Sequence, residues 1–129
     1  MVSAVNTIAN KGIYLKPTLV ENEVNPGVKV LSSESVSQIT EVMKLAVSHG
    51  EAKWSKPKNM SVAGKTGTAQ IPIEGHYDPD KTIASFVGFF PAENPKYTML
   101  VTLREPKTSI WGSETAAPLW FAIAKQLLL

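Results

Sequence analysis

The densest group of chemically useful side chains lies in residues 62–70, which read Val-Ala-Gly-Lys-Thr-Gly-Thr-Ala-Gln. Lys65 places a cation beside the hydroxyls of Thr66 and Thr68, and Gly67 separates the two threonines. The surrounding β-branched residues predict a strand, in which a glycine costs roughly 0.5 to 1 kcal/mol relative to alanine. A glycine in a strand commonly marks close approach by another backbone or by a ligand. The pattern is therefore compatible with a strand along which a peptide binds.

The same tetrapeptide also suits a purely structural role. A lysine on an exposed edge strand protects a sheet from pairing with another chain, and a glycine weakens that edge further. On these four residues alone, the functional and the structural interpretations have equal weight. Strand alternation places Thr66 and Thr68 on one face and Lys65 on the other, so strand twist decides whether the three side chains converge.

Nucleotide and metal sites are not predicted. A phosphate-binding loop ending in Gly64-Lys65-Thr66 requires a glycine at position 59, where the chain has asparagine, and a helix directly afterwards. His76, Asp78 and Asp80 alternate as metal ligands can, but their Asp- and Pro-rich setting indicates a polar loop between two strands. With no cysteine in the chain, disulfides and thiolate sites are excluded. We expect no metal and no cofactor.

Composition is that of an ordinary globular chain of 129 residues, with 43% hydrophobic and 19% charged residues. The net charge of +2 is too small to indicate a nucleic-acid surface. The lysines around Trp54 are therefore interpreted as a solvated loop over residues 51–59 with one anchored aromatic. The chain contains no apolar run near the ~20 residues of a membrane helix and no secretory signal pattern.

The first half is predicted to be mostly helical. Met1–Asn10 has helical apolar spacing with Gly12 as its terminator, and the absence of a preceding cap suggests that the helix begins upstream of Met1. Tyr14–Val24 reads as extended, and 28–31 follows a turn and pairs back onto it. A second helix runs to Gly50, with a capping box at Ser35-x-x-Gln38. Its predicted buried stripe consists of Val36, Ile39, Val42, Met43, Ala46 and Val47.

The second half is predicted to hold a sheet. Residues 62–71, 82–90 and 97–104 have strand composition, and a turn-rich link over 91–95 joins the last two. Glu114–Leu129 forms a final helix that tolerates Pro118 in its first turn. The class is therefore α+β, an antiparallel three-stranded meander with flanking helices. We expect one domain over 1–129, with the helices and small extended pair in 1–60 and the sheet with its last helix in 61–129.

Several motifs occur in the order typical of one family. They are Ile8-Ala9-Asn10-Lys11-Gly12 with Pro17, Ala63-Gly64-Lys65-Thr66-Gly67-Thr68-Ala69-Gln70, Ala84-Ser85-Phe86-Val87-Gly88-Phe89-Phe90-Pro91, and Ala116-Ala117-Pro118-Leu119-Trp120. In these segments the chain resembles the C-terminal part of the transpeptidase domain of class B penicillin-binding proteins, which cross-link the cell wall in elongation and division. Glu51, where the family commonly has threonine, and Trp111, where it commonly has tyrosine, depart from the pattern.

The resemblance implies a partial penicillin-binding-protein or serine β-lactamase-like fold and serine acyl transfer. In the family a serine attacks the D-Ala-D-Ala end of a stem peptide, releases D-Ala and passes the acyl group to an amine, and β-lactams imitate the donor. Carried over, Lys65 supplies positive potential beside the nucleophile, and Thr66 and Thr68 bind the substrate carboxylate. Gly67 gives clearance for the peptide, and the Thr68 N–H is one oxyanion donor.

The other catalytic motifs of that family are not found. The chain has no Ser-x-Asn, and its one Ser-x-x-Lys, Ser55-Lys56-Pro57-Lys58, is interrupted by proline and too close to Lys65. We therefore expect a C-terminal fragment that is inactive alone and whose partner is the upstream part of the same domain. The resemblance also implies the extracytoplasmic side of the cell envelope, with membrane attachment only through an N-terminal anchor outside this chain.

Two other functions stay open from the sequence. One is a non-catalytic module that binds peptides by adding them to the edge strand. The other is a β-lactam sensor or a β-lactamase relative. The resemblance also predicts that upstream strands of the family cover the strand over 97–104, so that the chain alone exposes an apolar edge there.

Overall fold

The structure is a computed structural model that describes residues 1–23 and 25–128. Its elements follow the predicted order of helix, small extended pair, helix, three strands and helix. In chain order they are α1 (Val2–Ala9), β1 (Ile13–Tyr14), β2 (Val28–Lys29), α2 (Ser33–His49), the 3-10 helix η1 (Glu51–Trp54), β3 (Ala63–Ile73), β4 (His76–Phe90), β5 (Tyr97–Arg104) and α3 (Ala116–Leu127).

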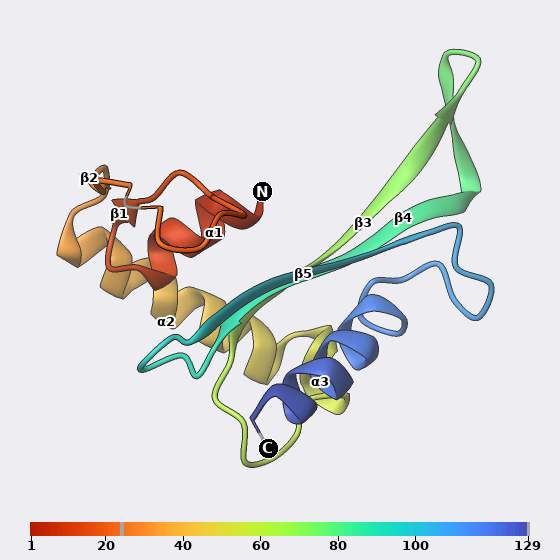
Figure 1. Ribbon diagram of the computed structural model, residues 1–129. Helices are drawn as coiled ribbons and strands as arrows, with labels where there is room; N and C mark the ends of the chain where they lie inside the picture. The colour runs from red at the N-terminus through yellow and green to blue at the C-terminus, as the bar shows by residue number, and fades with distance from the viewer. Residues whose placement is uncertain (24, 129) are drawn as a thin grey trace.

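The predicted three-stranded meander is confirmed. β3, β4 and β5 pair antiparallel in that order, so β3 and β5 are the two edges of this sheet. Thr66 of β3 lies opposite Phe86 of β4, and Phe86 lies opposite Val101 of β5. Figure 1 shows α3 against one side of the sheet, while α1 and α2 lie toward the end away from the β3–β4 hairpin tip.

Strand alternation divides the apolar side chains of β4 between two cores. Phe86 and Phe90 pack with Trp120 and Phe121 of α3, and the ring centroids of Phe86 and Trp120 are 5.0 Å apart. The buried Trp120 ring donates a hydrogen bond from Nε1 to the Met99 carbonyl at 2.9 Å. This contact fixes α3 against β5, the strand farthest from the predicted site.

The second core lies on the opposite face of the sheet. Phe89, one residue out of phase with Phe86 and Phe90, packs with Ala63 of β3 and Met43 of α2. Val5 and Ile8 of α1 cover this cluster. Residues of α1 and α2 therefore pack against the buried start of β3 on this face.

The hairpin between β3 and β4 is longer than predicted. Residues 75–80 were expected to form a loop, but β4 begins at His76 and only Glu74 and Gly75 turn, with φ of 46° and 87°. Two consecutive positive φ values are typical of the type I′ turn that matches strand twist. The Asp- and Pro-rich residues instead form an irregularity in the register, where the Asp78 carboxylate accepts the Asp80 and Lys81 N–H groups.

The second helix is confirmed, but its cap and its buried stripe were predicted wrongly. Ser32 is the N-cap and its hydroxyl accepts the Ser35 N–H at 3.0 Å, so Ser35-x-x-Gln38 is not the capping box. Of the predicted stripe only Met43 and Val47 are buried, and Val42 is 58% exposed. The helix packs against β3, η1 and α1, and of the other predicted stripe residues Val36 and Ala46 are half-buried while Ile39 and Val42 are exposed.

The C-terminal end of α1 and the strand pair that follows it have common backbone arrangements. α1 ends in a Schellman arrangement, in which Gly12 N–H reaches the Thr7 carbonyl and Lys11, at φ 56°, reaches the Ile8 carbonyl. The predicted pairing of the extended segments is confirmed for β1 and β2. Val24 and Leu129, the last residues of the segments predicted over 14–24 and 114–129, lie outside the described residues.

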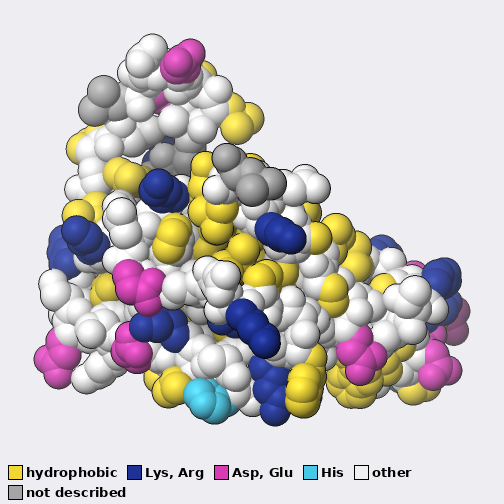
Figure 2. Space-filling view, turned by 90° about the horizontal axis from the view of Figure 1, so that it is seen from below, with side chains coloured by type: hydrophobic (Ala, Val, Ile, Leu, Met, Phe, Trp, Pro, Cys, Tyr) yellow, Lys and Arg dark blue, Asp and Glu magenta, His cyan; other side chains and the backbone are white. Residues whose placement is uncertain are grey.

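The segment after α2 differs from the predicted loop. It begins with η1, and Trp54 is 85% exposed rather than anchored, because Ala52 is the η1 residue that enters the core. Figure 2 shows Lys and Arg side chains interspersed with acidic and hydrophobic ones on the face seen from below. Within the part of the chain that is described, no helix combines the length and apolar content needed to cross a membrane.

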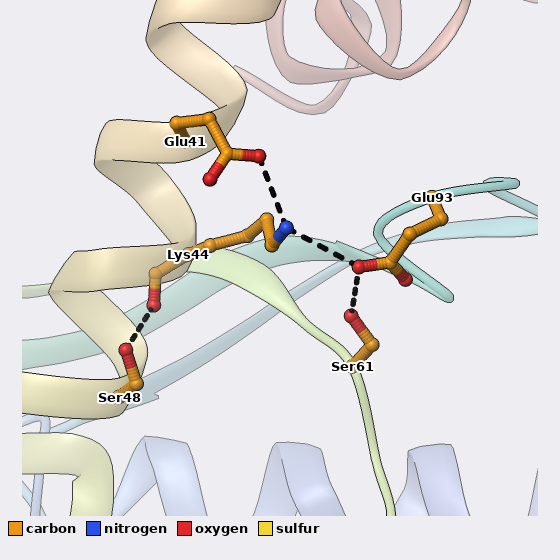
Figure 3. Close-up of polar contacts among 5 residues, drawn as sticks. All are labelled: Glu41, Lys44, Ser48, Ser61 and Glu93. Atoms are coloured by element: carbon orange, nitrogen blue, oxygen red, sulfur yellow. Dashed lines mark hydrogen bonds and ion pairs between the residues drawn. The ribbon is translucent and has the colours of Figure 1, made fainter.

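A polar network joins α2 to the link between β4 and β5 (Figure 3). Lys44 Nζ lies 3.0 Å from the Glu41 carboxylate and 3.3 Å from that of Glu93. Ser61 Oγ donates to the same Glu93 oxygen at 2.8 Å. The Ser61 hydroxyl first, then the Glu93 backbone N–H and Lys44, lower the pKa of the Glu93 carboxyl.

This network predicts a pH dependence of stability. Because the Glu93 pKa is lowered on folding, its contribution is present above the unfolded pKa and is lost as pH falls through the folded pKa. We expect Glu93→Gln to lose slightly less unfolding free energy than the wild type on going from neutral pH to below about pH 4.5, because solvent screens so exposed a pair. Urea denaturation across this range measures the difference, with Glu74→Gln at the hairpin turn as control. Equal pH dependence in wild type and Glu93→Gln would contradict this account.

Candidate active-site strand

The Lys65–Thr68 segment lies in β3, at an edge of the sheet, as predicted from its strand composition. Ala63 and Gly64, which precede it, are buried, whereas Lys65 and Thr68 are exposed. Gly64 is required here because a Cβ would come within 2.7 Å of the Phe86 ring. The candidate residues Lys65–Thr68 therefore follow directly after the buried start of β3.

The Lys65 side chain returns toward Thr66. Its Nζ donates to the Thr66 carbonyl at 3.0 Å and to Thr66 Oγ1 at 3.2 Å. Strand alternation alone places the two side chains on opposite faces. The length of the lysine side chain overcomes this separation, so the cation and the first hydroxyl meet at the strand edge.

The Thr68 hydroxyl is held by a residue that the sequence analysis did not assign to the site. Gly112, in the connection between β5 and α3, donates its N–H to Thr68 Oγ1 at 3.0 Å. A Cβ at Gly112 would lie 2.5 Å from the Gly67 carbonyl oxygen and 2.7 Å from that of Ser85. Only a glycine can approach β3 and β4 this closely, and the Trp111-Gly112 pair was the available sequence signal.

Packing within the fold explains why position 67 is a glycine. A Cβ there would lie 2.6 Å from Ser85 Oγ, and this hydroxyl donates to the Gly67 carbonyl at 3.4 Å. Packing against Ser85 thus accounts for the glycine without a bound peptide. Clearance for a ligand is compatible with the same position but is not needed to explain it.

The connection that carries Gly112 is itself tied to the sheet and to α3. Thr82 Oγ1 in β4 donates to the Ile110 carbonyl at 2.7 Å, and Thr115 Oγ1 donates to the Trp111 carbonyl at 2.6 Å. The buried Thr82 and Thr115 therefore hold both sides of the Trp111-Gly112 pair. Trp111 remains 50% exposed beside Gly112.

The remaining candidate residues do not join this site. Ser55 follows η1, and within residues 1–23 and 25–128 no hydrogen bond links it to Lys58 or Lys65. Asp78 uses its carboxylate for the backbone of its own hairpin. Among the described residues there is no group of three His, Cys, Asp or Glu side chains placed to hold a metal ion.

The close approach of Gly112 makes a specific stability prediction. Gly112→Ala should lower the unfolding free energy by about 2 kcal/mol, because the new methyl meets two backbone oxygens. Gly67→Ala should cost less, at most about 1 kcal/mol, because it meets a serine hydroxyl that can rotate away. Chemical denaturation of the two variants measures this contrast. A cost for Gly67→Ala equal to or above that of Gly112→Ala would contradict the packing described here.

Comparison with known proteins identifies the family. The model of the penicillin binding protein transpeptidase domain matches residues 1–128. Stage V sporulation protein D of Bacillus subtilis is 31% identical, over 92% of this chain and 20% of its own length. Penicillin-binding protein PbpB of Mycolicibacterium smegmatis is 28% identical, over 99% of this chain and 23% of its own length. The chain thus spans only about a fifth of the length of these curated relatives.

Solved structures agree in fold. The transpeptidase domain of FtsI4 D,D-transpeptidase from Legionella pneumophila has a TM-score of 0.78 at 30% identity, covering 99% of this chain and 45% of that one. The transpeptidase domain of penicillin-binding protein 3 from Burkholderia pseudomallei has a TM-score of 0.83 at 28% identity, and the match covers 98% of this chain and 40% of that one. These matches confirm the resemblance found in the motifs, and the chain belongs to the penicillin-binding protein transpeptidase domain family.

Proposed function

We propose that this chain forms the Lys65–Thr68 wall of the substrate cleft of a peptidoglycan D,D-transpeptidase, in a cell-wall enzyme of elongation, division or sporulation. The observation that carries the proposal is the polar edge of β3, where one ammonium and two hydroxyls are fixed by internal contacts. In a family whose substrates end in a carboxylate, such an edge supplies the matching charge and donors.

The hydrogen bonds within the site orient both hydroxyls. Thr66 Oγ1 accepts from Lys65 Nζ, and Thr68 Oγ1 accepts from Gly112 N–H. A hydroxyl has one donor in addition to its acceptor lone pairs, so each threonine keeps its O–H available for another partner. Two O–H donors and an ammonium on one strand edge favour a carboxylate ligand over a neutral or cationic one.

Each proposed role follows from this arrangement. Thr66 and Thr68 bind the terminal carboxylate of the donor peptide, and Lys65 adds positive potential beside the nucleophile. Gly67 permits the peptide backbone to approach β3, and the Thr68 N–H is one of two oxyanion donors. Losing one such donor typically costs about 10² to 10³ in rate, so both donors are needed for useful acyl transfer.

The nucleophile of this reaction is not among the 129 residues. The chain lacks Ser-x-Asn, and its one Ser-x-x-Lys begins at Ser55, which makes no hydrogen bond to Lys58 or Lys65 within the described residues. We propose that the upstream part of a transpeptidase domain supplies the serine and that the assembled cleft binds stem peptides and β-lactams. The M. tuberculosis protein PBPA, which has the same fold at 25% identity, forms a ceftriaxone acyl-enzyme complex. The proposed location is the extracytoplasmic side of the cell envelope.

A second candidate function is peptide binding without catalysis. β3 lies at an edge of its sheet, which is the geometry that strand addition requires. This function uses the same residues but needs no nucleophile. A stable covalent adduct with a penicillin is expected only if the chain is catalytic by itself. Neither non-catalytic peptide binding nor the proposed cleft wall alone produces such an adduct.

We expect a fluorescent penicillin to bind the 129-residue protein reversibly and to form no adduct that survives denaturation. Fluorescence anisotropy measures the reversible binding, and a denaturing gel measures the adduct. Because the penicillin carboxylate is the proposed ligand of the β3 edge, the double variant Thr66→Val with Thr68→Val should weaken binding about tenfold, for two lost hydrogen bonds. Thr102→Val, at an exposed position of β5, is the matched control.

Two results would contradict this proposal. A stable adduct that Ser55→Ala abolishes would make the chain catalytic alone and would place the nucleophile at Ser55. Equal penicillin affinity in the wild type and in the double threonine variant would remove β3 from the binding site.

A further inference from the structure

A pocket lies beside Trp111. Residues that follow α2, residues just before α3 and Pro118 in the first turn of α3 line this pocket of about 510 Å³. It is lined by Glu51, Trp54, Ser55, Trp111, Ser113, Glu114 and Pro118. None of these residues belongs to β3, so the pocket is separate from the Lys65–Thr68 edge.

Two tryptophans supply the aromatic part of this pocket. Trp54 is 85% exposed and Trp111 is 50% exposed, although both are large apolar side chains. The ring of Trp54 already attracts a cation of the same chain, since Lys53 Nζ lies 4.7 Å from the ring centroid. Exposed tryptophan faces bind ammonium and guanidinium groups through the ring quadrupole.

The charges of the pocket lining are all negative. Glu51 and Glu114 contribute carboxylates, and neither forms an ion pair with any residue in the described ranges. The backbone N–H groups at the start of α3 do not neutralise these two carboxylates. The Ala117 N–H is already used by the Gly112 carbonyl at 2.8 Å, and Pro118 has no N–H. The lining therefore favours a cation.

Ser113 adds a polar atom to the pocket lining. The residue is only 8% exposed and lines the pocket, and its hydroxyl has no hydrogen bond to a described residue. Since no fully buried side-chain oxygen among the described residues lacks a partner, this hydroxyl is accessible from the pocket. Its oxygen can accept a hydrogen bond from an ammonium N–H.

We propose that this pocket binds the alkylammonium group of a peptide side chain, with the methylene groups against Trp54 and Trp111 and the charge beside Glu51, Glu114 and Ser113. The pocket is joined to the carboxylate-binding edge through Gly112, whose N–H donates to Thr68 Oγ1. Binding of an ammonium group here is independent of the function proposed above.

The test is a titration of the 129-residue protein with Nα-acetyl-lysine N-methylamide, followed through the indole N–H signals in NMR spectra. The chain has three tryptophans, which Trp54→Phe and Trp111→Phe assign. We expect saturable shifts of the Trp54 and Trp111 signals. The Trp120 signal should not move, because that ring is buried and bonded to Met99.

Two matched comparisons make the test specific. The Nε-acetylated probe, which has lost its charge, should bind at least about fivefold more weakly. Glu51→Gln with Glu114→Gln should weaken binding of the charged probe by about fivefold, in the range expected for two exposed charge pairs, while Glu74→Gln should not. Equal shifts with both probes, no saturable shift, or an unchanged affinity in the double glutamine variant would each overturn the proposal. None of these results bears on penicillin binding at β3.

Discussion

The candidate site depends on one close approach, that of Gly112 to the paired strands β3 and β4. Because position 112 has no side chain, the backbone comes within hydrogen-bonding distance of Thr68 Oγ1 while passing over the Gly67 and Ser85 carbonyls. This contact links the edge strand to the connection before α3, and α3 is in turn fixed to β5 through Trp120 and Met99. The position of the Thr68 hydroxyl therefore depends on the packing of the last helix.

The same contact determines which hydrogen-bonding groups of the site remain free. A donated hydrogen bond from Gly112 occupies a lone pair of the Thr68 oxygen, and Lys65 does the same at Thr66. Both hydroxyl protons are left for an outside acceptor, and a carboxylate fits them best. Next to Gly112, the exposed Trp54 and Trp111 and two carboxylates line a second pocket. Gly112 is thus adjacent to both the proposed carboxylate site and the proposed ammonium site.

Local sequence patterns were sufficient for the order of the main strands and helices but not for all their bounds or for the contacts between them. The periodicity of Thr82–Phe90 and Tyr97–Arg104 predicted strands that the structure confirms. The Asp- and Pro-rich stretch after Gly75 was assigned to a loop because turn composition does not distinguish a loop from an irregular strand. Gly112 was missed because its role comes from residues 44 positions away. The exposure of Trp54 and Val42 likewise depends on what packs nearby, which the local pattern does not specify.

The central claim is that the β3 edge binds a peptide carboxylate through Thr66 and Thr68. Backbone amide shifts measured on adding a diacetyl-lysyl-D-Ala-D-Ala peptide test it most directly, with the same peptide amidated at its C-terminus as the matched ligand. The account predicts saturable shifts centred on residues 65–69 for the free carboxylate, and much weaker binding for the amide because the charge is lost. Equal binding of the two peptides, or shifts that leave β3 unaffected, would contradict it.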